Sequence, residues 1–363
     1  MKTFRILVRN LALAALCSLA ATLSTTSLAQ SYPPAWSNTA TYSVGDQVQL
    51  NGNVLRAVVA TPAPGSFIYS RWELWDVRAN TTFMVGVGQT FTNLLTAWNY
   101  VHNARVADGA YLHLYISTAK GAFSETFTAP FSLDQGSGAQ ISILGDKPGN
   151  INLTFSACNG FAIDSGHTFG TLENLTMNGA ATYTGVAASD LASITQIINV
   201  TVNGFGNSFT ASRNANLYLP DIAATSYVQA IYADQGATIN CPNIRLLQAE
   251  GFLGGDLFAT RGGIIYANGA SLSNADMGCH ADYGGMIYAF NCSICGCITG
   301  CYATHGGRIY IENNKLGVNV GSGALVNETD LNAKSGGVID AFLTAGSIPS
   351  ISIDSGVGSY VYY

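Results

Sequence analysis

The chain has 363 residues and a net charge of −6, and only 10% of its residues are charged. An acidic chain with so few basic side chains is a poor partner for nucleic acid, anionic lipid or an acidic polysaccharide. The 40 glycines and the 48% of hydrophobic residues are typical of an exported β protein, and the length allows one large core plus a small module.

Residues 1–29 are predicted to be a secretory signal peptide. Lys2, Arg5 and Arg9 form a positively charged start, LALAALCSLAATL supplies the apolar run, and Ser27-Leu28-Ala29 offers small residues for cleavage. The apolar run is too short to span a membrane, and an uncleaved membrane anchor is the alternative. We therefore expect a secreted or periplasmic protein whose mature chain has no membrane span.

Residues 30–80 are predicted to form a small β module of three strands. Gly45-Asp46 and Asn51-Gly52 are turn signals between alternating segments. Four aromatic residues of interest fall in this span: Trp36, Tyr42, Trp72 and Trp75. A module this small needs some of these rings for its core, whereas rings that stay exposed can stack on sugars and bind carbohydrate.

The spacing of these residues resembles that of the small chitin-binding modules attached to secreted bacterial chitinases and cellulases. The matching positions are Trp36, Tyr42, Gly45-Asp46, Val48, Gly52, Ala57, Pro62 and Trp72, whereas residues 58–61 replace an aromatic-rich run. The resemblance implies polysaccharide binding, with Trp72 on the binding face. The alternative is that Trp36, Tyr42 and Trp72 only form a small core.

Residues 85–110 are predicted to contain an amphipathic helix, because Phe91, Leu94, Leu95, Trp98 and Val101 recur at three and four residues. Thr90 or Thr92 can cap its start, and Asp108-Gly109 can end it. We expect this helix to cover the open end of the following domain, with His102 and the nearby His113 as surface residues rather than metal ligands.

Residues 111–363 are predicted to form a parallel β-helix, since blocks such as ATRGGIIYA, ADYGGMIYA and ATHGGRIYI recur at intervals of 22 to 30 residues. The seventh position of each block is apolar and is expected to face the interior: Leu217, Ile239, Ile265, Ile287, Ile309 and Ile339. Its neighbours alternate with it, as in a strand. Paired glycines such as Gly284-Gly285 precede each strand, where a tight corner needs a positive φ.

The order of a helix, Ala107-Asp108-Gly109, a strand, and then the segments 140–145 and 170–179 resembles the right-handed parallel β-helix proteins of phage tails and their bacterial relatives, which have the pectin-lyase-like fold. The resemblance implies the fold rather than one activity, because such proteins include lyases, hydrolases, adhesins and receptor-binding shafts. A homotrimeric shaft is a further expectation by analogy.

Two carboxylates are candidates for glycoside cleavage, which needs a pair of them across a groove. Asp234 and Asp282 occupy the same block position two rungs apart, so they should lie about 10 Å from each other along the axis. Arg261, Tyr283 and His305 follow in the next position and complete a polar groove. The alternative is a solvated corner with short ion pairs, such as Asp282 with Arg261.

Two further groups of residues are candidates for a functional site. Asp164 and His167 suggest an acid–base pair, which is a weak signal on its own. Tyr266, Tyr288 and Tyr310 face outward on successive rungs, either as a ladder that only stabilises the solenoid or as an aromatic platform for a glycan.

Seven cysteines follow the signal peptide, and Cys279 and Cys301 should sit on adjacent rungs. A disulfide between these two and a reduced stack of thiols are equally compatible with the spacing. Cys292 and Cys295 form a C-x-x-C, but no histidine lies at ligand spacing, so neither a metal nor a cofactor is predicted.

These features support two main hypotheses. The first is an exported, non-catalytic protein that binds a polysaccharide or cell-surface glycan and carries a β-helix shaft. The second is a polysaccharide-degrading hydrolase or lyase with its site on the β-helix face. The first is favoured because the motifs of pectate lyases and polygalacturonases are absent from the sequence. A purely structural phage-tail-like or adhesin shaft is a third hypothesis.

Overall fold

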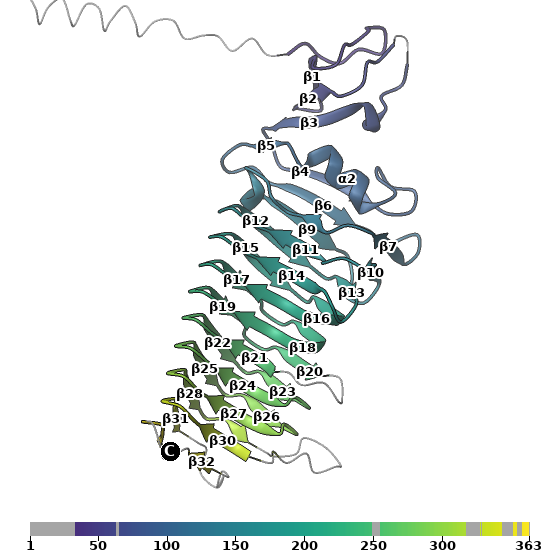
Figure 1. The fold of residues 1–363 in the computed structure, drawn as a ribbon. Coiled ribbons are helices and arrows are strands. Elements are labelled where there is room, and N and C mark those ends of the chain that lie inside the picture. The colour runs from purple at the N-terminus through teal and green to yellow at the C-terminus, as the bar shows by residue number, and fades with distance from the viewer. Residues whose placement is uncertain are drawn as a thin grey trace, which may run out of the picture.

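The structure is a computed structural model that describes residues 33–62, 65–248, 255–316, 327, 329–342, 351–353 and 358–362. It is a parallel β-solenoid of about eight turns, with 52% strand, 5% helix and a small N-terminal antiparallel sheet. The rungs stack along one axis, with the small sheet and the helix at the N-terminal end (Figure 1). The all-β solenoid predicted from the sequence is therefore confirmed, and the predicted signal peptide, 1–29, lies outside the described residues.

Two long parallel sheets form the walls of the solenoid. The twelve-stranded sheet contains β4 (Thr81–Val85), β6 (Leu112–Ile116), β9 (Ile141–Gly145), β12 (Thr168–Glu173), β15 (Ser193–Ile198), β17 (Asn216–Tyr218), β19 (Thr238–Asn240), β22 (Ile264–Asn268), β25 (Met286–Phe290), β28 (Arg308–Glu312), β31 (Val338–Phe342) and β33 (Tyr360–Tyr362). The seventeen-stranded sheet contains β7 (Phe123–Phe127), β8 (Phe131–Ser132), β10 (Ile151–Phe155), β11 (Phe161–Ile163), β13 (Thr176–Asn178), β14 (Thr184–Ala188), β16 (Thr201–Ala211), β18 (Ala223–Ala233), β20 (Arg245–Gln248), β21 (Gly255–Ala259), β23 (Ser271–Ser273), β24 (Met277–Ala281), β26 (Ser293–Cys295), β27 (Thr299–Ala303), β29 (Lys315–Leu316), β30 (Thr329–Ala333) and β32 (Ile351–Ile353).

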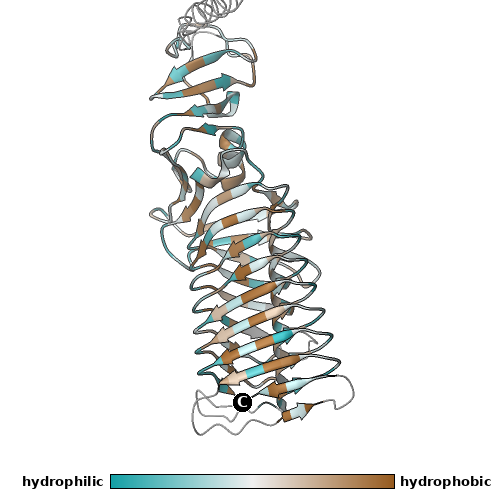
Figure 2. Cartoon of the chain, turned by 90° about the vertical axis from the view of Figure 1, so that its left-hand side faces the viewer, coloured by the Kyte–Doolittle hydropathy of each residue, from teal (hydrophilic) through white to brown (hydrophobic). Residues whose placement is uncertain are grey.

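The interior is a set of in-register apolar rows. Ile265, Ile287, Ile309 and Ile339 are successive register partners on β22, β25, β28 and β31, and all four side chains are fully buried. Hydrophobic residues recur at the same place in successive rungs (Figure 2). The inward row predicted from the seventh block position is thus confirmed, because side chains that alternate along each strand stack on their counterparts one rung away.

The two glycines of each pair have different roles, whereas the sequence predicted a positive φ for the pair. Only the first of each pair has a positive φ, for example 74° at Gly284. The second, Gly285, passes so close to the backbone of the preceding rung that a Cβ would lie 2.7 Å from the Thr260 amide nitrogen and closer still to the carbonyl of Ala259. One glycine is therefore required by its backbone angle and the other by close packing between rungs.

The N-terminal end is covered by helix α2, Leu94–Val101, whose start is capped by the Asn93 side chain accepting from the Thr96 amide at 2.8 Å. The helix is shorter than the predicted 85–110, because Gly86 and Gly88 adopt positive φ before it. Its Trp98 ring packs on Phe131 and Phe169 inside the first rungs, with centroid distances of 5.4 and 6.0 Å. The capping role is consistent with this packing.

The small N-terminal sheet has four strands rather than the predicted three. They are β1 (Gln47–Leu50), β2 (Asn53–Ala57), β3 (Trp72–Val77) and β5 (Arg105–Val106). Two short 3-10 helices lie elsewhere in the chain order, one before β3 at Tyr69–Arg71 and one before β9 at Gly138–Gln140. The fourth strand, β5, follows helix α2 in sequence and pairs in parallel with β3. The sheet therefore shares one continuous core with the solenoid. Across the described ranges, no helix has the length and apolar character needed to cross a membrane.

Candidate functional site

One corner of the solenoid gathers most of the residues singled out in the sequence. It joins the seventeen-stranded sheet to the twelve-stranded sheet, immediately after the buried register partners Ala233, Ala259, Ala281 and Ala303. We call it the polar edge and define it by two rows. The first row is Asp134, Asp164, Ser189, Ser212, Asp234, Thr260, Asp282, Thr304 and Lys334, and the second is Ser165, Asp190, Arg213, Gln235, Arg261, Tyr283, His305 and Ser335.

Within the described residues, acids of the polar edge take part in four ion pairs. They are Asp134 with His167 (3.7 Å), Asp190 with Arg213 (3.1 Å), Asp234 with Arg261, and Asp282 with His305 (2.8 Å). Each pair joins two consecutive rungs, and no rung takes part in two pairs. The expected pairing of Asp282 with Arg261 is wrong, because each cation reaches back to the acid of the preceding rung.

The two candidate catalytic carboxylates are both engaged in these contacts. Asp234 is only 5% exposed, and both of its oxygens accept hydrogen bonds from Arg261. Asp282 accepts from the Tyr283 amide at 2.8 Å and contacts His305 Nδ1 at the same distance. Their catalytic roles remain predictions, and the contacts favour a part in holding the corner together.

The outward tyrosines form a stacked ladder on the strands that follow the polar edge. Tyr266 and Tyr288 have ring centroids 5.0 Å apart at 12°, and Tyr288 and Tyr310 lie 4.8 Å apart at 7°. Because the inner rings face each other, the ladder presents mainly ring edges and hydroxyl groups to solvent. Tyr266, at the end of the ladder, is 41% exposed.

An aromatic row that the sequence interpretation missed flanks the polar edge. Tyr232, Phe258, His280 and Tyr302 lie in ring contact on successive rungs just before the corner, with centroid distances of 5.4, 4.4 and 5.1 Å. Each residue directly precedes the alanine of a repeat block, which is the signal that would have revealed this row. At the corner itself, the rings of Tyr283 and His305 stack at 4.7 Å and 5°.

His280 is expected to make the stability of the solenoid depend on pH. Burial lowers the pKa of His280 to about 4, against the opposing effect of the Asp282 carboxylate, whereas the unfolded chain has an ordinary imidazole pKa near 6.5. Between these two values the unfolded chain binds the proton and the folded chain does not, so stability falls as the pH is lowered through this range.

Replacing His280 with phenylalanine should remove this dependence and preserve the stack. Between pH 7 and pH 4, we expect wild type to lose about 2 kcal/mol more unfolding free energy than His280→Phe does. This loss is smaller than the full shift in the pKa of His280 would give, because the ring is partly exposed. Urea unfolding at a series of pH values measures it. Parallel pH profiles for the two proteins would contradict the assignment.

The aromatic residues of the small N-terminal sheet are largely internal. Trp72 is 2% exposed and packs on Phe67 and Tyr42, with centroids 5.9 and 5.2 Å away. The expectation that Trp72 lies on a sugar-binding face is therefore corrected, since its ring belongs to the core. Trp36 is half-buried against Phe67, and Trp75 has the Arg56 guanidinium 3.8 Å from its ring centroid.

All seven described cysteines are buried free thiols. Cys279 and Cys301 are register partners on β24 and β27, so the predicted neighbourhood is correct. The structure has the reduced stack instead of the disulfide. In an in-register parallel pair the Cβ atoms run side by side at about the strand spacing of 4.8 Å, which exceeds the roughly 3.8 Å that a disulfide prefers. A hydrogen bond with Cys301, together with burial, raises the pKa of Cys279.

A cleft of about 620 Å³ lies at the N-terminal end of the polar edge, lined by residues that include His102, Arg105, Asp134, Ser137 and His167. His167 Nδ1 lies 2.9 Å from the backbone oxygen of Asp164 and 3.7 Å from Asp134 Oδ1. The suspected acid–base partner of His167 is thus Asp134 rather than the Asp164 carboxylate. His113 lies away from this cleft, stacked on Tyr111 at 4.1 Å.

No family model matches the chain, no curated protein is significantly similar to it, and no solved structure matches its fold significantly. The chain is therefore assigned to the class of parallel β-solenoid proteins on its own geometry. The resemblances to chitin-binding modules and to phage-tail β-helices, and the homotrimer that the second implies, remain predictions.

Proposed function

We propose that this protein is exported and binds an extended polysaccharide or cell-surface glycan along the polar edge and the adjacent tyrosine ladder, Tyr266, Tyr288 and Tyr310, without cleaving it. The observation that carries this proposal is the repetition of side chains along the edge and the ladder. On successive rungs, polar or aromatic side chains lie one strand spacing from their register partners on the rung before, as Tyr266, Tyr288 and Tyr310 do. A sugar polymer also repeats its hydroxyl groups along its length, so an aligned chain can meet one row of side chains after another.

The exposed groups of the edge suit sugars chemically. A tyrosine hydroxyl both donates and accepts hydrogen bonds, as sugar hydroxyls do. Tyr283 is 60% exposed and stacks on His305 alone among the described rings, which leaves its other face open to a sugar ring. The acidic composition disfavours a polyanionic ligand, so a neutral glycan is the better match.

Affinity along such an edge comes from many weak contacts. A single hydroxyl contact stabilises a complex by only about 1 kcal/mol. Several contacts on one rigid surface act together, because the first bound unit raises the effective concentration of the next. The rigid stacking of the rungs supports this arrangement, since the binding groups need no reordering.

The acids of the edge favour binding over cleavage. A hydrolase needs one carboxyl group free to protonate the leaving oxygen and a second free to activate water or attack the sugar. Both oxygens of Asp234 are held by Arg261, and Asp282 is held by His305. The alternative activity, hydrolysis or elimination, is tested by reducing-sugar release and unsaturated-product absorbance over a glycan panel.

A carbohydrate array probed with the secreted protein tests the proposal. We expect binding to a neutral polysaccharide, weakened about three- to tenfold by each of Tyr266→Phe and Tyr310→Phe, because these changes keep the ring stack and remove one hydroxyl. Tyr111→Phe, on an exposed tyrosine outside the edge, is the matched control and should bind as wild type. Absence of any glycan ligand, or wild-type binding by the two ladder variants, would refute the proposal.

A further inference from the structure

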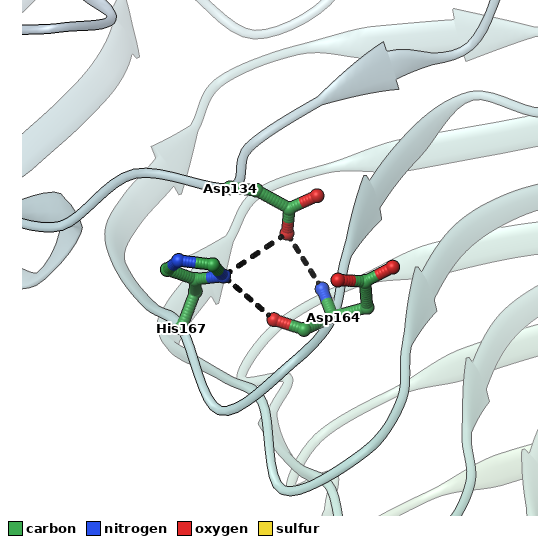
Figure 3. Close-up of side chains that lie close together, drawn as sticks. All are labelled: Asp134, Asp164 and His167. Atoms are coloured by element: carbon green, nitrogen blue, oxygen red, sulfur yellow. Dashed lines mark hydrogen bonds and ion pairs between the residues drawn. The ribbon is translucent and has the colours of Figure 1, made fainter.

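Three potential metal ligands converge at the N-terminal end of the polar edge. Side-chain ligand atoms of Asp134, Asp164 and His167 all lie within 4.8 Å of one another (Figure 3). Asp134 follows β8, Asp164 follows β11 on the next rung, and His167 precedes β12. Asp134 and Asp164 are 30 positions apart, and the pairing of β8 with β11 brings them onto neighbouring rungs. Phe131 pairs with Phe161, and Ser132 pairs with Ala162.

The sequence at this rung departs from the repeat. The position of His167 is occupied by alanine or glycine in each of the described rungs that follow it: Ala192, Ala215, Ala237, Gly263, Gly285, Gly307 and Gly337. The repeat therefore does not need an imidazole here. The first-row position of Asp164 is serine in the next two rungs, Ser189 and Ser212, so the carboxylate is not needed for the corner either.

The charge balance also differs from that of the other ion pairs. The other three pairs of the polar edge each combine one acid with one base at 3.1 Å or less. Here Asp134 and Asp164 supply two carboxylates for one imidazole, and the ion pair between His167 and Asp134 is longer, at 3.7 Å. The site thus holds an excess of negative charge, which a divalent cation would neutralise.

The separation of two of the three ligands is close to that in a coordination site. The Asp164 amide donates to Asp134 Oδ1 at 2.7 Å and orients that carboxylate toward the imidazole. Two ligands on a tetrahedral zinc ion lie roughly 3.3 Å apart, given metal–ligand distances of about 2.0–2.1 Å. The separation of 3.7 Å between His167 Nδ1 and Asp134 Oδ1 is within a few tenths of an ångström of this value.

We propose that Asp134, Asp164 and His167 bind a divalent metal ion of the zinc type. A mixed set of one imidazole and two carboxylates suits zinc better than calcium, which takes oxygen ligands. Asp134 and His167 also line the cleft of about 620 Å³, so the remaining coordination position faces a space where a water molecule or an anionic group can enter. Zinc bound at Nδ1 would release to solvent the proton that Nδ1 donates to the Asp164 carbonyl, and the carbonyl would lose this hydrogen bond.

Equilibrium dialysis of the purified full chain against Zn²⁺, with elemental analysis of the bound metal, tests this site. We expect one zinc per chain and a rise in the thermal unfolding midpoint on zinc addition. His167→Ala and Asp164→Ser introduce the residues that neighbouring rungs carry, so both variants should fold. Each should weaken zinc binding at least about 10- to 100-fold, because that loss already follows from removing a group that only supports a metal ligand.

Asp190→Asn, which removes an acid from another ion pair of the same edge, is the control and should bind zinc as wild type. The proposal is overturned if His167→Ala and Asp164→Ser keep wild-type zinc affinity, which would place the metal elsewhere, for instance on the thiols. Tighter binding of Ca²⁺ than of Zn²⁺ in a parallel dialysis would equally overturn the assignment to a zinc-type site.

Discussion

Gly285→Ala is expected to destabilise the solenoid by about 3 kcal/mol or more, because the added methyl group has no room between two rungs. The new Cβ would overlap the Ala259 carbonyl and lie 2.7 Å from the Thr260 amide nitrogen. These atoms belong to the backbone ladder between rungs, so they cannot turn aside as a flexible side chain would. Urea unfolding monitored by circular dichroism measures the loss.

The adjacent Gly284 provides the matched control. It has a φ of 74°, and a Cβ there would meet no atom within 4 Å. Gly284→Ala should therefore cost only about 1–2 kcal/mol, the strain of placing a side chain in the left-handed region. If Gly285→Ala were no more harmful than Gly284→Ala, the close contact between rungs would be disproved.

The second large effect is expected at the inward row. Ile287 is fully buried between Ile265 and Ile309, so Ile287→Ala should lower the unfolding free energy by about 2–5 kcal/mol through lost burial and the cavity left behind. Met286 is its partly exposed outward neighbour, and Met286→Ala should cost less than about 1 kcal/mol. Equal losses in the two variants, measured by the same unfolding assay, would show that the inward row is misassigned.

The repeat made the fold of the regular rungs predictable. Alternation of apolar residues identifies the inward side of each strand, and the recurrence of Ile265, Ile287 and Ile309 fixes the register between rungs. The N-terminal part was harder, because strand β5 pairs with β3 across helix α2, and such a long-range pairing leaves no local pattern. The helix limits were missed because the glycines before it carry φ angles that periodicity does not reveal.

The rows of the polar edge could be predicted, but the contacts within them could not. Block position alone places Asp234, Arg261, Asp282 and His305 on one corner. Which acid each cation contacts depends on the direction in which its side chain points along the axis, and block position does not reveal that direction. The approach of Asp134 to His167 was hidden as well, since the first rung has a longer, irregular corner.

Titration calorimetry tests most directly the central claim that the protein binds a glycan through repeated contacts. The experiment measures the affinity of the array-selected glycan with oligomers of increasing length. If the polar edge and the tyrosine ladder bind a polymer through repeated contacts on successive rungs, affinity should rise with oligomer length. The triple variant Tyr266→Phe, Tyr288→Phe, Tyr310→Phe should lose most of that rise. Short oligomers that bind as tightly as the polymer, or a triple variant with wild-type length dependence, would contradict it.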